Sequence, residues 1–224
     1  KLFDRSNHND KLTILTYIAN CLFKTNKNKQ SLKYAELLLN SMQEYDGLLY
    51  DKYLFFYYNI LVSNYSVTDK EKALNYLDKA SNNEVIKKLP SYNSFIYLNR
   101  SLIYYDQDKF KKSKQNISRL IMQKDFLLLD QSFQLKILIT SIIISCKNSE
   151  NNMLEKINDI KDNYNALLKT ENHLRDSMFL DLISKKIAGS DFEKDKSIFL
   201  SNISEKESKE LDIIGYNNWV KINI

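Results

Sequence analysis

The chain has 224 residues, of which 43% are hydrophobic, and carries a net charge of +5 from 33 basic and 28 acidic side chains. It contains only three glycines and one proline, too few for the many tight turns of a β-sandwich or β-barrel. The composition therefore indicates an all-α protein with long helices joined by short polar loops.

Apolar residues recur at helical spacing along most of the chain, and clusters of Asn, Lys, Asp and Ser separate the helical stretches. Gly47, Pro90 and Gly189 mark three of the breaks. In chain order, we expect five antiparallel helix pairs over residues 11–44, 48–82, 91–123, 128–168 and 171–208. No shift in composition marks a boundary, so a single helical domain over 1–224 is expected.

The last segment of the chain, residues 209–224, is expected to form a C-terminal cap on the fifth helix pair. Its apolar residues would cover the exposed face of that pair, and they are Ile213, Ile214, Tyr216, Trp219 and Val220.

The helical stretches repeat with a period of 38–40 residues. A shift of residues 54–82 by 40 positions matches residues of the same type: Phe55 with Phe95, Tyr57 with Tyr97, Asn59 with Asn99 and Tyr65 with Tyr105. A shift of 39 in the other direction matches Asn59 with Asn20. Such a repeat indicates stacked helix pairs, because each pair leaves an apolar face that only its neighbours cover.

Two segments resemble a tetratricopeptide repeat. Residues 104–113, YYDQDKFKKS, resemble its inner turn, where an aromatic residue ends one helix and an aromatic and a small residue open the next. Residues 72–80 resemble its second helix, with Ala73 and Ala80 at the two small positions. The sequence departs from the motif at Leu61, where Gly or Ala is preferred, and at Asp108, where Gly is preferred. The period also exceeds the usual length of about 34 residues.

The resemblance covers residues 48–123 best. It implies a right-handed α-solenoid that binds a protein or peptide partner on its concave face. The lengthened helices have a second, less specific resemblance to the repeat domains of bacterial peptide-pheromone receptors of the Rap and PlcR type.

The first helix of each pair would line the concave face, and Asn20, Asn59 and Asn99 would occupy equivalent places on three such helices. An Asn side chain offers both a donor and an acceptor, which suits the alternating groups of an extended peptide. The flanking residues expected on the concave face are Phe55, Tyr58, Val62, Tyr65, Phe95, Leu98, Leu102 and Tyr105. Of these, Phe55, Tyr58, Phe95 and Leu98 would provide pockets for side chains. The alternative is that these asparagines form hydrogen bonds between repeats.

Signals for catalysis are almost absent, so the sequence predicts a non-enzymatic protein without cofactor or metal. The three glycines are too far apart for a phosphate-binding loop, and no metal-ligand or nucleophile motif is present. His8 lies in a polar lead-in where a solvated or capping role is expected, and His173 begins a helix with no expected function.

Of the 33 basic residues, 29 are lysines spread along the chain, which does not favour nucleic-acid binding. The most apolar run, Ile137 to Cys146, is half the length of a membrane span and indicates a helix buried on nearly all sides. Cys21 and Cys146 lack any CxxC partner and are expected to be reduced core thiols of a cytoplasmic protein.

The chain begins at Lys1 rather than Met. This suggests a second hypothesis, a ligand-sensing domain of a bacterial regulator separated from an upstream DNA-binding or effector module. The oligomeric state and the identity of the partner do not follow from any motif.

Overall fold

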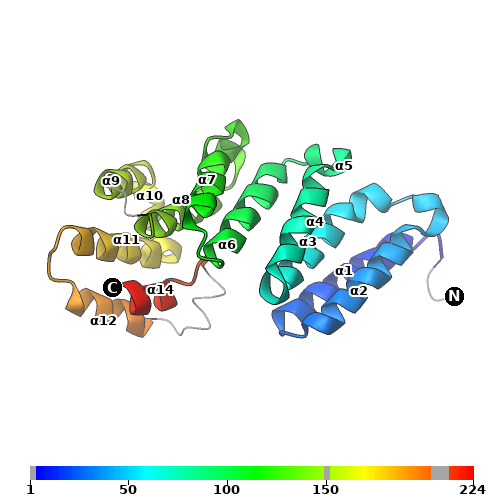
Figure 1. The fold of residues 1–224 in the computed structure, drawn as a ribbon, viewed down its shortest axis with the longest axis horizontal. Helices are drawn as coiled ribbons and strands as arrows, with labels where there is room; N and C mark the ends of the chain where they lie inside the picture. The colour runs from blue at the N-terminus through cyan, green and yellow to red at the C-terminus, as the bar shows by residue number, and fades with distance from the viewer. Residues whose placement is uncertain (1–3, 149–151, 203–211) are drawn as a thin grey trace. The chain divides into compact units, whose positions relative to one another are not determined.

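The computed structural model describes residues 4–148, 152–202 and 212–224. These residues form helices joined by turns and contain no strand, as the composition predicts (Figure 1). The chain divides into two compact units, residues 1–107 and 108–224. The single domain expected over 1–224 stays a prediction.

The first unit consists of α1 (His8–Lys24), α2 (Asn28–Met42), α3 (Tyr50–Thr68), α4 (Lys70–Ser81), the short α5 (Glu84–Lys87), and a π-helical stretch (Ser94–Leu98) that continues into α6 (Asn99–Tyr105). α1 packs against α2, and α3 packs against α4. α3 also contacts both helices of the preceding pair, and α6 contacts α4. Successive helices therefore pack as neighbouring pairs within this unit.

Small side chains lie where the helices of the first unit approach one another. Ala73 and Ala80, the small positions of the tetratricopeptide resemblance, are fully buried, and so are Ala19 and Ala35 on the preceding pair. Close packing of helices requires small residues at the contact. Larger apolar side chains fill the remaining core, among them Leu12, Leu38, Met42, Ile60, Leu77 and Ile86.

Left-handed backbone conformations occur in several turns, among them those at Gly47 and Asp108. Gly47 has φ +72° and ends a 3-10 turn, Glu44–Gly47, in which Tyr45 and Asp46 also have positive φ. Asp108 has φ +56°, at the position where the tetratricopeptide motif prefers glycine. Aspartate tolerates this region better than most residues. Asp108 thus adopts a backbone conformation that glycine favours.

The second unit consists of α7 (Phe110–Ile121), α8 (Gln131–Cys146), α9 (Met153–Asn163), α10 (Asn165–Leu168), α11 (Leu174–Ile187), α12 (Glu193–Asn202) and α14 (Tyr216–Asn223). Two 3-10 helices, Lys124–Leu128 and Glu171–His173, precede α8 and α11. The expected pairs begin and end within three residues of observed helices, except that residue 208 lies outside the described ranges.

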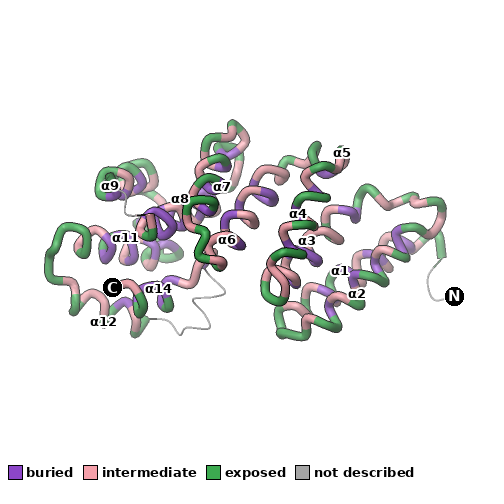
Figure 2. Tube along the Cα trace, viewed as in Figure 1, coloured by how far each residue is buried: buried purple, intermediate pink, exposed green. Residues whose placement is uncertain are grey.

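α8 is buried on nearly all sides, as its composition predicts (Figure 2). Its buried residues include Ile137, Ile139, Ile142, Ile143 and Ile144, which surround the helix axis. Over the described ranges, no helix combines the length and the apolar character that a membrane span requires.

α14 contacts α12 and also packs on α11 through aromatic rings. Tyr216 stacks on Phe179 with ring centroids 4.1 Å apart, and Trp219 meets the same ring edge to face at 5.6 Å. Of the expected cap residues, Tyr216, Trp219 and Val220 are buried, whereas Ile213 and Ile214 are half-buried. Residues 209–211 of the expected cap lie outside the described residues.

Candidate functional site

The three candidate asparagines lie on three different helices of the first unit. Asn20 is on α1, Asn59 is on α3 and Asn99 is the first residue of α6, and each is half-buried. The amide of Asn99 donates a 2.7 Å hydrogen bond to the backbone oxygen of Phe95 in its own helix. The side chains of Asn20 and Asn59 have no hydrogen-bond partner among the described residues. None of the three forms a side-chain bridge between the helix pairs that the structure describes.

A fourth asparagine, which the repeat pattern did not single out, connects the first two helix pairs. The amide of Asn64 donates to the Ser31 hydroxyl over 2.8 Å and to the backbone oxygen of Ile60 over 2.8 Å. The Ser31 hydroxyl donates in turn to the backbone oxygen of Ala19 over 2.8 Å. Asn64 and Ser31 are completely buried, so this chain of hydrogen bonds joins α3, α2 and α1 inside the core.

The flanking candidates fall into two groups. Val62, Phe95 and Leu98 are buried at 0%, 6% and 8% exposure, a position that suits helix packing better than contact with a peptide. The half-buried group keeps accessible surface and consists of Phe55, Tyr58, Tyr65, Leu102 and Tyr105. The structure brings Phe55 against Phe95, with ring centroids 5.0 Å apart.

Tyr58 and Tyr65 belong to a tyrosine cluster on α3 and α4. Tyr65 stacks on Tyr76 at 5.4 Å, and Tyr57 lies 5.7 Å from Tyr58. Burial raises the pKa of Tyr57 to about 12, and the neighbouring tyrosines add to this effect. Burial also raises the pKa of Tyr58. The hydroxyls of both therefore remain protonated donors at neutral pH.

Cations lie close to this cluster. The ammonium group of Lys79 is 5.0 Å from the centre of the Tyr76 ring, and that of Lys72 is 5.6 Å from the centre of the Tyr65 ring. The negative face of an aromatic ring attracts a cation at such distances. The lysines therefore help to hold the rings of the cluster in place.

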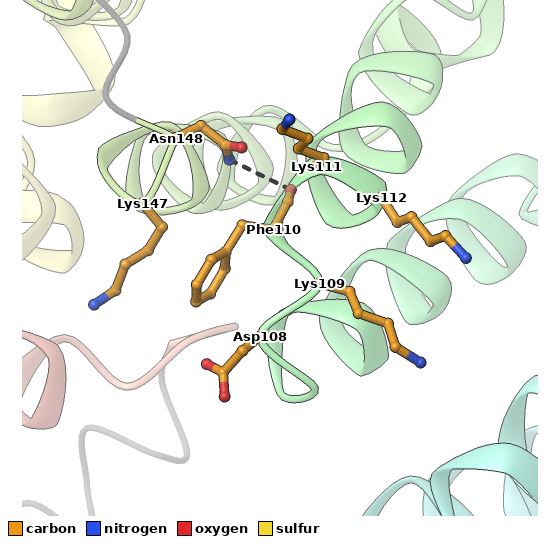
Figure 3. A pocket seen from close by; sticks show the side chains of 7 residues that line it. All are labelled: Asp108, Lys109, Phe110, Lys111, Lys112, Lys147 and Asn148. Atoms are coloured by element: carbon orange, nitrogen blue, oxygen red, sulfur yellow. Dashed lines mark hydrogen bonds between the residues drawn. The ribbon is translucent and has the colours of Figure 1, made fainter.

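The second unit contains a cavity of about 520 Å³ at the start of α7, lined by Asp108 to Lys112 and by Lys147 and Asn148 (Figure 3). The amide of Asn148 donates to the backbone oxygen of Phe110 over 3.3 Å, and the ammonium group of Lys147 is 6.0 Å from the Phe110 ring centre. Figure 3 shows the Lys111 side chain next to Asn148. Lysines thus dominate the charged lining of this cavity.

Two further cavities continue along α7. The first has a volume of about 570 Å³ and is lined by residues that include Lys111, Lys114, Ser118 and Met122. The second has a volume of about 390 Å³ and shares Ser118 and Met122 with the first. Because neighbouring cavities share residues, they form one groove beside α7. We call it the α7 groove. None of the residues that line it is among the candidates that the sequence predicts.

A buried polar cluster connects α8, α11 and α14. The Ser132 hydroxyl is 2.9 Å from His173 Nε2, and His173 Nδ1 is 2.8 Å from an oxygen of Asp176. The other oxygen of Asp176 accepts from the Lys136 ammonium at 2.6 Å and from the Tyr216 hydroxyl at 3.0 Å. Asp176 is fully buried, so its charge depends on these donors.

The order Ser132, His173, Asp176 matches a nucleophile, a base and an orienting carboxylate. The sequence did not indicate this arrangement, because the residues come from separate elements. However, the N–H groups of Ser132 and Phe133 donate to Asp130 at 2.9 and 3.2 Å. These N–H groups are therefore not available to stabilise an oxyanion beside Ser132.

Arg175 extends the polar cluster toward the C-terminal segment. Its guanidinium contacts Asp212 at 2.6 Å, and the other oxygen of Asp212 accepts from the backbone N–H of Tyr216 at 3.0 Å. Burial, followed by the nearby charge of Asp176, raises the pKa of the Tyr216 hydroxyl well above its usual value. The cluster therefore positions three helices against one another.

His8 corrects an expectation from the sequence. It is only 1% exposed and packs edge to face on Tyr45 at 4.9 Å, rather than lying in solvent. Helix α1 starts at His8, so this residue belongs to the helix and not to a polar lead-in. Cys21, expected in the core, is exposed, whereas Cys146 is half-buried.

In the part of the chain that the structure describes, no group of three or more His, Cys, Asp or Glu side chains is arranged to hold a metal ion. Comparisons with protein-family models, curated proteins and solved structures give no significant match to this chain.

Proposed function

We propose that this chain is a non-enzymatic helical-repeat module that binds a protein or peptide partner. The binding surface is the concave face formed by α1, α3 and α6 of the first unit, which carry Asn20, Asn59 and Asn99. An extended segment of the partner lies across these helices, and the asparagine amides bond its backbone.

The main support is that side-chain contacts recur at the repeat period inside each unit. In the first unit, Thr13 bonds Tyr53 and Phe55 contacts Phe95, both at a separation of 40 residues. In the second unit, Lys136 bonds Asp176 and Asp176 bonds Tyr216 at the same separation. Residues at equivalent places of successive repeats meet in this way when helix pairs stack as in a right-handed α-solenoid.

The state of the asparagines also supports the proposal. Asn64 already provides the buried connection between helix pairs, at 0% exposure. Asn20 and Asn59 are half-buried and have no hydrogen-bond partner among the described residues, so their amides can bond a partner. Asn99 uses one amide hydrogen for its bond to Phe95, and its second amide hydrogen and its side-chain oxygen remain for a partner. The half-buried side chains of Phe55, Tyr58 and Tyr65 provide apolar and hydroxyl surface on the same helix as Asn59.

A peptide selection tests the proposal. A phage-displayed library of random peptides is selected on the full chain, with the Asn59→Ala/Asn99→Ala variant as the counter-target. Peptides that survive are measured by calorimetry against both proteins. Two lost hydrogen bonds of typical strength predict an affinity loss of about tenfold or more.

The matched control is Asn40→Ala/Asn75→Ala, which removes two exposed asparagines from α2 and α4. The control should bind the selected peptides as the unmodified chain does. The proposal fails if no peptide prefers the unmodified chain, or if the control loses as much affinity as Asn59→Ala/Asn99→Ala.

A further inference from the structure

We propose that the α7 groove of the second unit binds an acidic segment of a protein partner, and that this segment also inserts an apolar side chain. This site shares no residue with the asparagine surface of the first unit. It therefore goes beyond the function proposed above, and each can fail without the other.

One part of the groove is basic. Lys111, Lys114 and Arg119 line the same cavity on α7, and Lys147 lines the adjoining one. A helix rises about 1.5 Å per residue, so residues 111 to 119 extend over about 12 Å. Three or four residues of an extended chain cover this length. Carboxylates on successive residues of an acidic segment can therefore lie opposite the cationic side chains of α7.

The other end has an apolar wall. The cavity of about 390 Å³ lies where α7, α8 and α9 meet, with Ile121, Leu138, Ile142 and Ile160 in its lining, which also includes Lys156, Asp159 and Asn163 of α9. Binding pockets for small ligands begin at about 300 Å³, so this volume is sufficient for one large aliphatic or aromatic side chain. The end of the groove beyond Ser118 therefore suits an apolar anchor.

Unusually exposed apolar side chains follow this end of the groove. Met122, which lines it, is 82% exposed, and Leu127 and Leu128 are 75% and 85% exposed. The Tyr164 hydroxyl, in the cavity lining, donates to Gln134, whose amide donates to the backbone oxygen of Leu127. This connection holds the Leu127 backbone close to the cavity. Adjacent exposed apolar residues are typical of an interaction site.

Charge and apolar surface together favour a peptide over a nucleic acid. A nucleic acid presents phosphates along its whole length and has no aliphatic side chain for the apolar cavity. Arg119 is the single arginine in the lining of these cavities as described, whereas base recognition relies on arginine. An acidic segment with one apolar side chain matches both the basic part and the apolar part of the α7 groove.

Defined peptides test this assignment on the full chain. Fluorescein-labelled peptides carry two leucines at one end and three glutamates at the other, with spacers of one to three serines, and are made in both chain directions. Counterparts carry lysines in place of the glutamates. Fluorescence anisotropy should give at least one acidic peptide that binds ten times more tightly than its lysine counterpart.

Two variants locate the binding. Lys111→Glu/Lys114→Glu should reverse the preference, so that the lysine peptide binds more tightly. Met122→Asp places a charge beside the apolar cavity and should weaken the acidic peptide about tenfold. Lys33→Glu/Lys88→Glu, which changes two exposed lysines of the first unit, is the control and should keep the original preference.

Three results would overturn the assignment. They are the absence of any preference for the acidic peptides, a preference that Lys111→Glu/Lys114→Glu does not alter, and stronger competition by a single-stranded oligonucleotide than by the acidic peptide. Asn59→Ala/Asn99→Ala should leave this binding unchanged, which separates it from the function of the first unit.

Discussion

The rings of Phe55 and Phe95 lie 5.0 Å apart at an angle of 69°, in an edge-to-face contact between α3 and the π-helical stretch before α6. The two residues are 40 positions apart, the shift at which the sequence matches itself. Such a contact contributes about 0.5–1.5 kcal/mol beyond area burial. The aromatic residues at these two positions therefore serve the packing of the π-helical stretch on α3.

Asn64→Ala should lower the free energy of unfolding by about 1–3 kcal/mol, because the buried Ser31 hydroxyl loses its donor. Urea unfolding measures the change. Asn59→Ala is the matched control on the same helix and should cost less than about 0.5 kcal/mol, as is typical of positions without a specific contact. Equal costs for the two variants would contradict a structural role for Asn64 that Asn59 does not share.

Tyr57 should make the protein less stable in alkali. Its pKa is about 12 in the folded chain against a usual value of 10.0, so the unfolded chain loses this proton first. The contribution of the protonated Tyr57 hydroxyl to the free energy of unfolding is fully present below pH 10, and it is lost as the pH rises toward 12. Between these values, the unmodified chain should lose stability more steeply than Tyr57→Phe in urea unfolding. Parallel pH profiles of the two proteins would rule out this effect.

Asp176→Ala should destabilise the second unit by about 3–5 kcal/mol, because Lys136 and His173 then lose a fully buried carboxylate partner. The control is Asp181→Ala, which removes the exposed partner of Lys161 and should cost 0 to about 1 kcal/mol. Thermal or urea unfolding compares the two. A cost for Asp176→Ala as small as that for Asp181→Ala would contradict the claim that Lys136 and His173 depend on this buried carboxylate.

Ser132 should not react with a fluorophosphonate probe, since the nearby N–H groups of α8 are bonded to Asp130. Mass spectrometry of the treated chain checks this directly. Stoichiometric labelling of Ser132 that disappears in His173→Ala would instead demonstrate an activated nucleophile.

Several features of the fold could be predicted because they follow from local patterns. The apolar run of α8 predicts burial on all sides, and the small residues Ala73 and Ala80 predict close helix contacts. Asp108 keeps the left-handed turn because its short side chain permits positive φ. The short helix α5 was not expected, since it depends on the side chain of Asn83, which caps two N–H groups.

The polar contacts were harder to predict because they depend on tertiary neighbours. Asn64 has no asparagine at the shifts of 39 and 40 residues that relate Asn20, Asn59 and Asn99, so a search for equivalent residues at these shifts passes over it in favour of Asn59. Its burial results from the positions of Ser31 and Ala19. For the polar cluster a signal was present, since Lys136, Asp176 and Tyr216 follow one another at 40-residue intervals.

The central claim is that Asn59 and Asn99 bond the backbone of an extended peptide. A double-mutant cycle tests it most directly, with a selected peptide that is N-methylated at single backbone amides and with Asn59→Ala/Asn99→Ala as the protein change. Calorimetry should give, for at least one amide, a coupling of about 0.5–1.5 kcal/mol, the strength of one hydrogen bond. Additive losses at every amide, with no coupling, would contradict the claim.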